Sequence, residues 1–486
     1  MRRPAGVGGV MRVVVVGAGM SGARLAEELR RAEPDPERVA VTVLGAEPEA
    51  PYNRIMLSHV VAGGMGDPSA TRLKPSGWWG RNGIEMRTDA SVRGIDRATR
   101  EVELADGERV PYDHLVLATG SEPTIPPIDG VRGPDGTLAA GVFPLRDAAD
   151  CRGLTGHLEE NPGRVALVGG GFIGLEVACA LAKSGRDVVV VHPRAWPMDS
   201  HLDSGGGRVL IRALDELGVR VVTGARAARW DGTALGLEDG TEIGCRTVVL
   251  SAGTRPRTSV AESAGLEVGR GVVVDDTLAT SDPAISAIGD CAEHRGCVTG
   301  LVGPAWDQAG VVSARITGAD PGARYPGGVA VTRLKAFGVD VVSLGELAGD
   351  VHDPEVEVTV VCEPSRGRYA RVDVVDARVT GAVLVGHPEP VGFLTQLYEH
   401  ALPVPDDVLS VVLGRASAAT TDTPSTMPAA AVVCRCNGVS KADLVHAWSE
   451  GDRDAAAMAS RTRAGTGCGG CAAAVDGICG WLRECA

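Results

Sequence analysis

Two stretches of the chain combine a short apolar run, a glycine-rich turn and a helical pattern. In residues 11–30 four consecutive valines precede the turn and SGARLAEELRRA follows it, and residues 39–44 form another apolar run. Residues 164–191 repeat this order. β-Branched runs without polar alternation are typical of buried parallel strands, and strands that alternate with helices build parallel sheets. The pattern predicts two doubly wound α/β domains.

The rest of the chain has a different pattern. Residues 326–415 alternate apolar and polar side chains, as in YARVDVVDARVTGAVLVG, which predicts an antiparallel sheet with one solvated face. Residues 416–430 are rich in Ala, Ser, Thr and Pro without periodicity, the composition of a flexible linker. Residues 431–486 contain four closely spaced cysteines, which predicts a small separate module.

Charge and composition exclude several classes of function. The 486 residues include 62 acidic and 48 basic side chains, a net charge of −14, and only 3% are aromatic. A nucleic-acid-binding protein needs a basic surface or aromatic stacking platforms, so we expect no nucleic-acid partner. The most membrane-like stretch, residues 165–182, contains three consecutive glycines and Glu176, and the N-terminal apolar run leads into a turn instead of a cleavage site. We therefore expect a soluble cytoplasmic protein without a membrane partner.

The two glycine turns have the spacing of dinucleotide-binding sites. The first is Gly17-Ala18-Gly19-Met20-Ser21-Gly22, and Gly169-Gly170-Gly171-Phe172-Ile173-Gly174 repeats it. The first glycine permits the tight turn, the second lets the backbone approach a pyrophosphate, and the third lets the helix pack against the strand. The phosphates lie at the helix N-terminus, where free N–H groups favour negative charge. Two such turns predict one tightly bound and one exchanging nucleotide cofactor.

Four of the twelve cysteines form two short pairs, Cys434-Arg435-Cys436 and Cys468-Gly469-Gly470-Cys471. The other eight are scattered, so the pattern indicates a reducing compartment and one metal site, not a disulfide scaffold. Four thiolates hold either tetrahedral zinc or an iron–sulfur cluster, and the spacing alone leaves both open.

Six ordered motifs carry a family resemblance over about residues 11–325. They are VVVVGAGMSG, PYNRIMLS, LVLATGSEP, VALVGGGFIGLE, SAGTRP and AISAIGDCAE. This region resembles the pyridine-nucleotide-dependent flavoprotein reductases. The resemblance implies FAD at the first glycine turn and NADH or NADPH at the second, in a domain inserted into the FAD-binding domain. It also implies that Asp290 binds the flavin ribityl chain, that Arg54 contacts the flavin, and that Glu176 lies beside the nicotinamide and flavin rings.

Several candidate site residues allow more than one interpretation. Glu176 is otherwise an ordinary first-turn helix acid, favoured by the helix dipole. Where the family often has an acid directly after the second strand this chain has Ala46, so Glu47 is the candidate for the FAD ribose. His192 and Arg194 stand where an acid would hold the NADH ribose, and Arg194 is either a partner for a 2′-phosphate or a surface residue. The choice of nucleotide stays open, and our hypothesis is dual use with Arg194 carrying any preference for NADPH.

The candidate residues fall into two nucleotide sites. The first site comprises Gly17, Ala18, Gly19, Ser21, Gly22, Glu47, Arg54, Thr119, Gly120 and Asp290. The second comprises Gly169, Gly171, Phe172, Ile173, Gly174, His192, Arg194 and Gly253, with Glu176 as the candidate catalytic residue.

Disulfide reductases of this fold carry a redox-active cysteine pair beside the flavin. No cysteine precedes Cys151, and the inserted domain contains no Cys-x-x-Cys. Cys291 and Cys297 are expected to be structural, because isolated cysteines usually behave as small apolar residues. Disulfide reduction by this route is therefore excluded, and electrons must leave the flavin for another acceptor.

The terminal module adds a second resemblance. The sequence VVCRCNGVSKADL…RTRAGTGCGGC is similar to the bacterioferritin-associated-ferredoxin-like [2Fe–2S] domain within NAD(P)H nitrite reductase large subunits. This implies a [2Fe–2S] cluster on Cys434, Cys436, Cys468 and Cys471, and attachment to a flavin domain disfavours zinc because zinc cannot accept electrons. Cys479 and Cys485 are expected to be packing residues.

With LKAFGVDVVSLGE (334–346), the whole arrangement is similar to the front part of those subunits. They continue into a sirohaem and [4Fe–4S] region that this sequence lacks, so we do not expect it to reduce nitrite alone. Shorter relatives serve as electron-transfer subunits of assimilatory nitrate reductases. We therefore expect hydride transfer from NAD(P)H to FAD, then single electrons through the cluster to a nitrate or nitrite reductase partner. The alternatives are a ferredoxin or rubredoxin reductase of another pathway, and a flavoprotein with a docking or iron-sensing module.

The expected fold is α/β, with two Rossmann-like doubly wound domains, an α+β third domain and a small, mainly helical [2Fe–2S] module. The expected segments are an FAD-binding domain (11–144 and 246–325), an NAD(P)H-binding domain (145–245), a reductase C-terminal domain (326–415), a linker (416–430) and a [2Fe–2S] domain (431–486).

Overall fold

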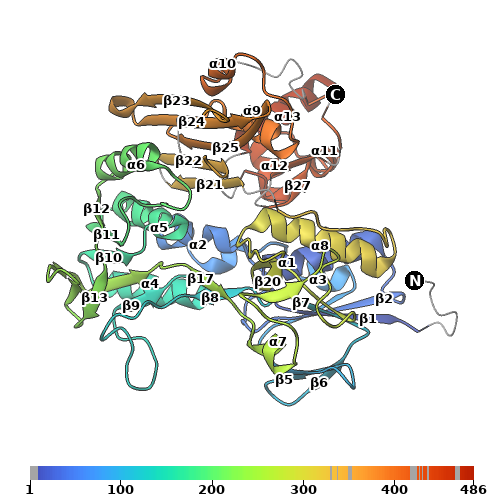
Figure 1. The fold of residues 1–486 in the computed structure, drawn as a ribbon. Helices are drawn as coiled ribbons and strands as arrows, with labels where there is room; N and C mark the ends of the chain where they lie inside the picture. The colour runs from blue at the N-terminus through green and yellow to red at the C-terminus, as the bar shows by residue number, and fades with distance from the viewer. Residues whose placement is uncertain are drawn as a thin grey trace. The chain divides into compact units, whose positions relative to one another are not determined.

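The computed structural model describes residues 9–328, 331–336, 338–348, 353–415, 424–425, 427–429, 431–434, 437–465 and 471–485. The chain, drawn in Figure 1, divides into two compact units. The first unit comprises Met1–Arg54, Pro68–Glu122 and Thr254–Gly328, and the second comprises Ile55–Asp67, Pro123–Gly253 and Val329–Ala486. Most of the expected linker, 416–423 with 426 and 430, lies outside the described residues.

The first unit is built on a five-stranded parallel sheet in the order β19-β7-β1-β2-β3. Its strands are β1 (Met11–Val16), β2 (Val39–Leu44), β3 (Ile84–Arg87), β7 (His114–Leu117) and β19 (Ile285–Ala287). The four valines of β1 are buried, as expected of a central parallel strand. The helices of this unit are α1 (Met20–Ala32), α3 (Trp78–Arg81), α7 (Ser259–Ser263) and α8 (Val302–Thr317). α1 packs against α8.

Smaller sheets complete the first unit. An antiparallel sheet contains β4 (Val92–Asp96), β5 (Glu101–Leu104) and β6 (Arg109–Pro111), and the two strand pairs are β8 (Ser121–Pro123) with β17 (Thr254–Pro256) and β18 (Val272–Val274) with β20 (Ala292–His294).

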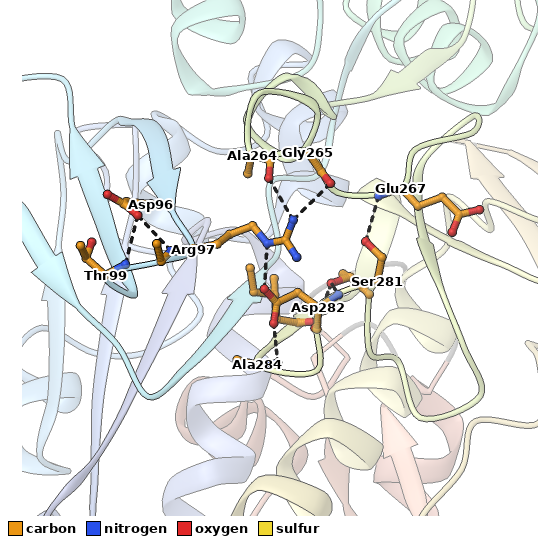
Figure 2. Close-up of polar contacts among 12 residues, drawn as sticks. Asp96, Arg97, Thr99, Ala264, Gly265, Glu267, Ser281, Asp282 and Ala284 are labelled. Carbon is orange, nitrogen blue, oxygen red and sulfur yellow. Dashed lines mark hydrogen bonds and ion pairs between the residues drawn. The ribbon is translucent and has the colours of Figure 1, made fainter.

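Arg97, beyond β4, joins the two sequence segments of this unit that flank the second glycine turn. As Figure 2 shows, its guanidinium donates to Asp282 Oδ2 at 2.8 Å and to the carbonyls of Ala264 and Gly265 at 3.4 and 3.3 Å. The segments before and after residues 123–253 therefore belong to the same unit. This confirms the predicted insertion of one doubly wound domain into another.

The second unit begins with another five-stranded parallel sheet, in the order β12-β11-β10-β16-β9. Its strands are β9 (Val142–Pro144), β10 (Val165–Val168), β11 (Val188–His192), β12 (Val219–Thr223) and β16 (Thr247–Leu250). The helices of this part are α2 (Leu57–Val61), α4 (Ala148–Glu160), α5 (Phe172–Lys183) and α6 (Ser204–Glu216). A small antiparallel sheet contains β13 (Ala227–Trp230), β14 (Ala234–Leu237) and β15 (Glu242–Gly244).

The third five-stranded sheet, called the third sheet below, is antiparallel, as predicted. Its strand order is β21-β22-β25-β24-β23. Its strands are β21 (Val331–Ala336), β22 (Val339–Gly345), β23 (Glu357–Glu363), β24 (Arg368–Val375) and β25 (Arg378–Val385). One face forms an apolar core with α9 (Val391–Glu399) and α10 (Val408–Val412).

The prediction of a solvated second face is wrong, because α6 contacts β22, β24 and β25 on that face (Figure 1). Tyr369, Arg371 and Asp373 alternate with the core residues of β24 and are all buried. Arg371 and Asp373 are compatible with burial because they pair through two hydrogen bonds of 2.8 Å. The polar positions of this strand therefore form an internal interface.

The terminal module is mainly helical, as predicted. It contains the strand pair β26 (Val432–Cys434) and β27 (Val439–Ser440), and the helices α11 (Lys441–Ser449), α12 (Ala455–Thr462) and α13 (Ala472–Cys485). Within the described part of the chain, no helix is long and apolar enough to cross a membrane.

Candidate functional site

The first glycine turn joins β1 to α1 through close backbone contacts. Gly17 has φ +118°, and a Cβ there would lie 2.1 Å from the carbonyl oxygen of Ala118. A Cβ on Gly22 would lie 1.9 Å from the carbonyl oxygen of Gly17. Gly19 is the N-cap of α1 and provides no side-chain cap. The first N–H groups of the helix thus lack a side-chain acceptor from their cap, as a phosphate site requires.

Asp290 lies beside this turn at the end of β19. Gly289, with φ +74°, would place a Cβ 2.4 Å from Ser21 Oγ, so the Gly-Asp pair approaches the turn closely. Ser121 Oγ donates to Asp290 Oδ2 at 2.9 Å. Thr119 Oγ1 donates to the carbonyl of Arg257 at 2.7 Å, and Gly120 follows it with φ +71°. Ser121 lies within the motif LVLATGSEP, but the sequence alone did not identify it as a neighbour of Asp290.

Glu47 and Arg54 meet in an ion pair within the first unit. Tyr52 donates its hydroxyl to the other oxygen of Glu47 at 2.6 Å. Arg54 also reaches the turn, because its Nε lies 3.9 Å from the place of a Cβ on Gly19. The turn contacts the end of β2 as well, where a Cβ on Gly45 would lie 2.6 Å from the Cβ of Ala18. The structure thus brings together the predicted residues of the first site.

The second glycine turn reproduces the first within the inserted domain. Gly169 has φ +114°, and its Cβ would lie 2.1 Å from the carbonyl oxygen of Ser251. A Cβ on Gly174 would lie 2.4 Å from the carbonyl oxygen of Gly169. Gly171 is the N-cap of α5 without a side-chain cap, and the position of its absent Cβ is open. The same nucleotide-binding geometry therefore occurs twice.

Other predicted residues flank this second turn. The Phe172 ring packs edge-on against His201 with 4.8 Å between ring centroids, and the Ile173 side chain is exposed. Gly253, with φ +91°, lies just beyond β16.

At the end of β11, His192 contacts Asp199, a residue that our sequence reasoning missed. The distance from His192 Nε2 to Asp199 Oδ1 is 3.1 Å, and Arg194 Nε lies 3.8 Å from Asp199 Oδ2. No local pattern pointed to Asp199, because it returns to the strand end through a loop.

Glu176 lies on α5 and contacts the PYNRIMLS segment. Ser58 Oγ on α2 lies 3.3 Å from Glu176 Oε2, at hydrogen-bonding distance. Ser58 is buried and thus helps to fix the position of this carboxylate.

Cys434 and Cys471 belong to one buried core in the terminal module. The amide of Asn437 lies 3.7 Å from Cys434 Sγ, and Gly465 N donates to Cys471 Sγ at 3.1 Å. N–H donors of this kind stabilise thiolates, so the donor set fits a thiolate-bound metal centre. Cys436 and Cys468, the other predicted ligands, lie outside the described residues. Cys479 is buried in the same core, as expected of a packing residue. The expected packing role of Cys485 is wrong, because this residue is exposed.

Four buried cysteines outside the terminal module have a raised pKa. Burial raises the pKa of Cys151 and of Cys245 to about 11 and that of Cys179 to about 12. The pKa of Cys291 is raised by burial as well. These thiols stay protonated near neutral pH, which suits packing and does not suit thiol–disulfide exchange.

Residues 11–309 match the family described as pyridine nucleotide-disulphide oxidoreductase, which is more than half of the chain. The chain belongs to this family. Residues 331–397 of the oxidoreductase match the C-terminal domain of rubredoxin NAD+ reductase, and residues 432–479 match the BFD-like [2Fe–2S] binding domain. It is therefore an FAD-dependent oxidoreductase that uses NAD(P)H and has a [2Fe–2S] domain, which confirms the predicted family and cofactors.

Curated relatives resemble the oxidoreductase over nearly its whole length. Nitrite reductase [NAD(P)H] of Bacillus subtilis is 33% identical over 97% of this chain and 57% of the relative. The assimilatory nitrate reductase electron transfer subunit of B. subtilis is 30% identical over 97% of this chain and 60% of the relative. The chain thus spans under two thirds of the length of either relative.

Among solved structures, the ferredoxin reductase of the CYP199A2 system of Rhodopseudomonas palustris is similar, with a TM-score of 0.72 and 26% identity. The similarity covers 83% of this chain and 100% of that structure.

Proposed function

We propose that this oxidoreductase is an electron-transfer subunit that delivers electrons from NAD(P)H to a nitrate or nitrite reductase catalytic subunit in the cytoplasm. The observation that carries the proposal is the similarity to the two B. subtilis proteins over 97% of the chain, which includes the cysteine module. When bound, FAD accepts hydride and a [2Fe–2S] cluster carries single electrons. The chain's own residues bind and orient these groups.

In this proposal the FAD-binding domain comprises residues 11–144 and 246–325. The uncapped N-terminus of α1 at Gly19 binds the pyrophosphate. Asp290, with Ser121 orienting one carboxylate oxygen, binds the ribityl chain. Glu47 binds the ribose, and Arg54, which pairs with it, adds positive charge beside the turn.

The NAD(P)H-binding domain comprises residues 145–245 in this proposal. Gly171, the uncapped N-cap of α5, offers the corresponding N–H groups to the second pyrophosphate. Glu176 lies in the first two turns of the same helix, and its contact with Ser58 orients the carboxylate. We propose that this carboxylate helps to position the nicotinamide.

The [2Fe–2S] domain comprises residues 431–486, with Cys434, Cys436, Cys468 and Cys471 as ligands. The donors at Asn437 and Gly465 stabilise the negative charge of the two described thiolates. Ile55, which directly follows Arg54 in the chain, packs against the core of this domain. The residue that follows Arg54 thus contributes to the packing of the [2Fe–2S] domain.

A second candidate is a ferredoxin or rubredoxin-type reductase. The match of residues 331–397 to the rubredoxin reductase domain and the similarity to a ferredoxin reductase structure favour it. The two candidates differ in the acceptor and in the need for the terminal cysteines.

The test compares the full chain with a variant truncated after residue 430. NAD(P)H-dependent reduction of ferricyanide reports the flavin, and reduction of nitrate by an added molybdopterin nitrate reductase reports delivery to the partner. We expect truncation to preserve most ferricyanide activity and to abolish nitrate reduction. Rubredoxin or ferredoxin reduction that survives truncation, without nitrate reduction by the full chain, would instead support the second candidate.

A further inference from the structure

The loop after β11 returns to the second glycine turn. Met198 N donates a hydrogen bond of 2.9 Å to the carbonyl of Gly170, the second residue of that turn. Met198 has φ +55°, a left-handed conformation that residues with a side chain adopt rarely. Met198 is also buried, so packing holds this conformation. The reversal places the next residue, Asp199, back at the end of the strand.

His192 connects Asp199 to the turn. The N–H of Gly170 donates to His192 Nδ1 at 3.1 Å, which leaves the ring proton on Nε2. Nε2 therefore donates to Asp199 Oδ1 at 3.1 Å. The His192 side chain is only 9% exposed, so the orientation of its ring is fixed by packing as well as by these two bonds. The ring holds a carboxylate where the strand itself supplies no acid.

Asp199 also faces Arg194. Arg194 Nε lies 3.8 Å from Asp199 Oδ2, and the Arg194 side chain is 68% exposed. A ribose 2′-phosphate at this place would gain the positive charge of Arg194 and meet the negative charge of Asp199. The negative charge of Asp199 thus weakens the attraction that Arg194 would exert on a 2′-phosphate.

We propose that Asp199 is the specificity-determining residue of the second nucleotide site and that it selects NADH over NADPH. Its carboxylate accepts hydrogen bonds from the ribose hydroxyls, the role of the acid that dinucleotide-binding domains carry near this strand end. The same charge repels a 2′-phosphate. This proposal rests on the proposed function in one respect, the binding of NAD(P)H at this turn, and replaces dual use with a preference for NADH.

The test uses the full-length, cofactor-loaded protein and the variants Asp199→Asn and Asp199→Glu. Asp187→Asn is the matched control, because Asp187 is an exposed acid of the same domain that pairs with Arg164. Isothermal titration with NAD+ and with NADP+ gives the dissociation constants. kcat/KM for NADH and for NADPH, with ferricyanide as acceptor, gives a second and independent ratio.

We expect Asp199→Asn to shift both ratios toward the phosphorylated nucleotide by about tenfold or more. Asp199→Glu and Asp187→Asn should keep the preference for NADH. Adding Arg194→Ala to Asp199→Asn should reverse the gain, since the arginine then no longer binds the phosphate. Unchanged ratios in Asp199→Asn, with NADH binding intact, would overturn the inference. If the wild-type protein bound neither nucleotide, the proposed function would fail, and this inference with it.

Discussion

Tyr369 donates a hydrogen bond of 2.5 Å from its hydroxyl to Asp203 Oδ2, which joins β24 to the start of α6. The other oxygen of Asp203 accepts from Gly206 N at 2.9 Å and so caps the helix. Burial, and then the hydrogen bond to Asp203, raise the pKa of Tyr369, so the phenol remains a donor at neutral pH. One carboxylate therefore anchors the nucleotide-binding domain to the third sheet.

Arg371 and Asp373 next to this contact provide a test of the buried interface. Arg371→Met would leave Asp373, which is 0% exposed, without its cation. Removing one partner of a buried pair is expected to lower the free energy of unfolding by about 3–5 kcal/mol. Arg368→Met is the control, because Arg368 pairs with Glu389 at 3.7 Å on the surface, and about 0–1 kcal/mol is expected. Urea unfolding of both variants checks the difference, and equal losses would contradict it.

Arg54 should contribute to FAD retention. Arg54→Met removes the cation beside Gly19 and leaves Glu47 without its ion-pair partner. We expect FAD to bind about tenfold more weakly, the effect of losing one charge-assisted contact. Arg38→Met, at an exposed side chain that pairs with Glu33, should leave FAD binding unchanged. Titration of apoprotein with FAD, followed by flavin fluorescence, measures both constants. Equal affinity in the two variants would rule out a role for Arg54.

Substitution of the terminal cysteines should remove the cluster without affecting FAD binding. Cys434→Ser and Cys471→Ser should each reduce the iron and acid-labile sulfide content well below two per chain and leave the FAD content unchanged. Cys485→Ser, at an exposed position on α13, should keep the cluster. Metal analysis and visible absorption of protein purified without oxygen provide the measurement. Zinc in place of iron in the wild-type protein would disprove the cluster assignment.

How much the sequence predicts depends on how local the signal is. The glycine turns were predicted because the spacing of their glycines is a local signal, and the contact between Gly22 and Gly17 lies within one strand–turn–helix unit. Asp199 gave no such signal, because its partners are set by a reversal at Met198 that only the packed structure shows. The residue roles at both nucleotide sites remain predictions, which the variants above test.

The third sheet shows how a correct pattern gave one wrong conclusion. Alternation along β24 predicted the antiparallel sheet, and the structure confirms it. Alternation cannot distinguish a solvated polar position from a buried one that has a partner. Arg371 and Asp373 are such positions, because they pair with each other and Arg371 also pairs with Asp203 of a distant segment.

Because of His114, we expect the free energy of unfolding of the first unit to depend on pH. Burial, with a smaller contribution from the positive charge of Arg315, lowers the pKa of His114 to about 4. Because the unfolded chain takes up this proton near pH 6.5 and the folded chain does not, stability is highest above pH 6.5 and falls as the pH drops toward 4. The loss is at most about 3 kcal/mol. His114→Gln, which can keep a hydrogen bond to Ser286, should flatten the dependence of the unfolding free energy between pH 7 and 5. An unchanged slope would contradict the assignment.

Two glycines in helices should respond oppositely to the same substitution. Gly156 lies in α4, where an added Cβ meets no atom within 4 Å. Gly156→Ala should therefore stabilise the protein by about 0.4–1 kcal/mol, because alanine favours the helix and restricts the unfolded chain. Gly205 lies in the first turn of α6, where a Cβ would stand 2.5 Å from Tyr369 Cε2.

The Tyr369 ring cannot move away from the added Cβ easily, because its hydroxyl donates a hydrogen bond to Asp203. We expect Gly205→Ala to destabilise by about 1–3 kcal/mol, the range for overpacking a well-packed site. Thermal and urea unfolding of the two single variants give the signs. The double variant Gly205→Ala with Tyr369→Val identifies the cause: removal of the ring should make the alanine nearly neutral, since the clash is gone. If alanine at position 205 remains as destabilising in the Tyr369→Val background, the ring is not what requires glycine there, and the close approach of β24 to α6 does not determine this position.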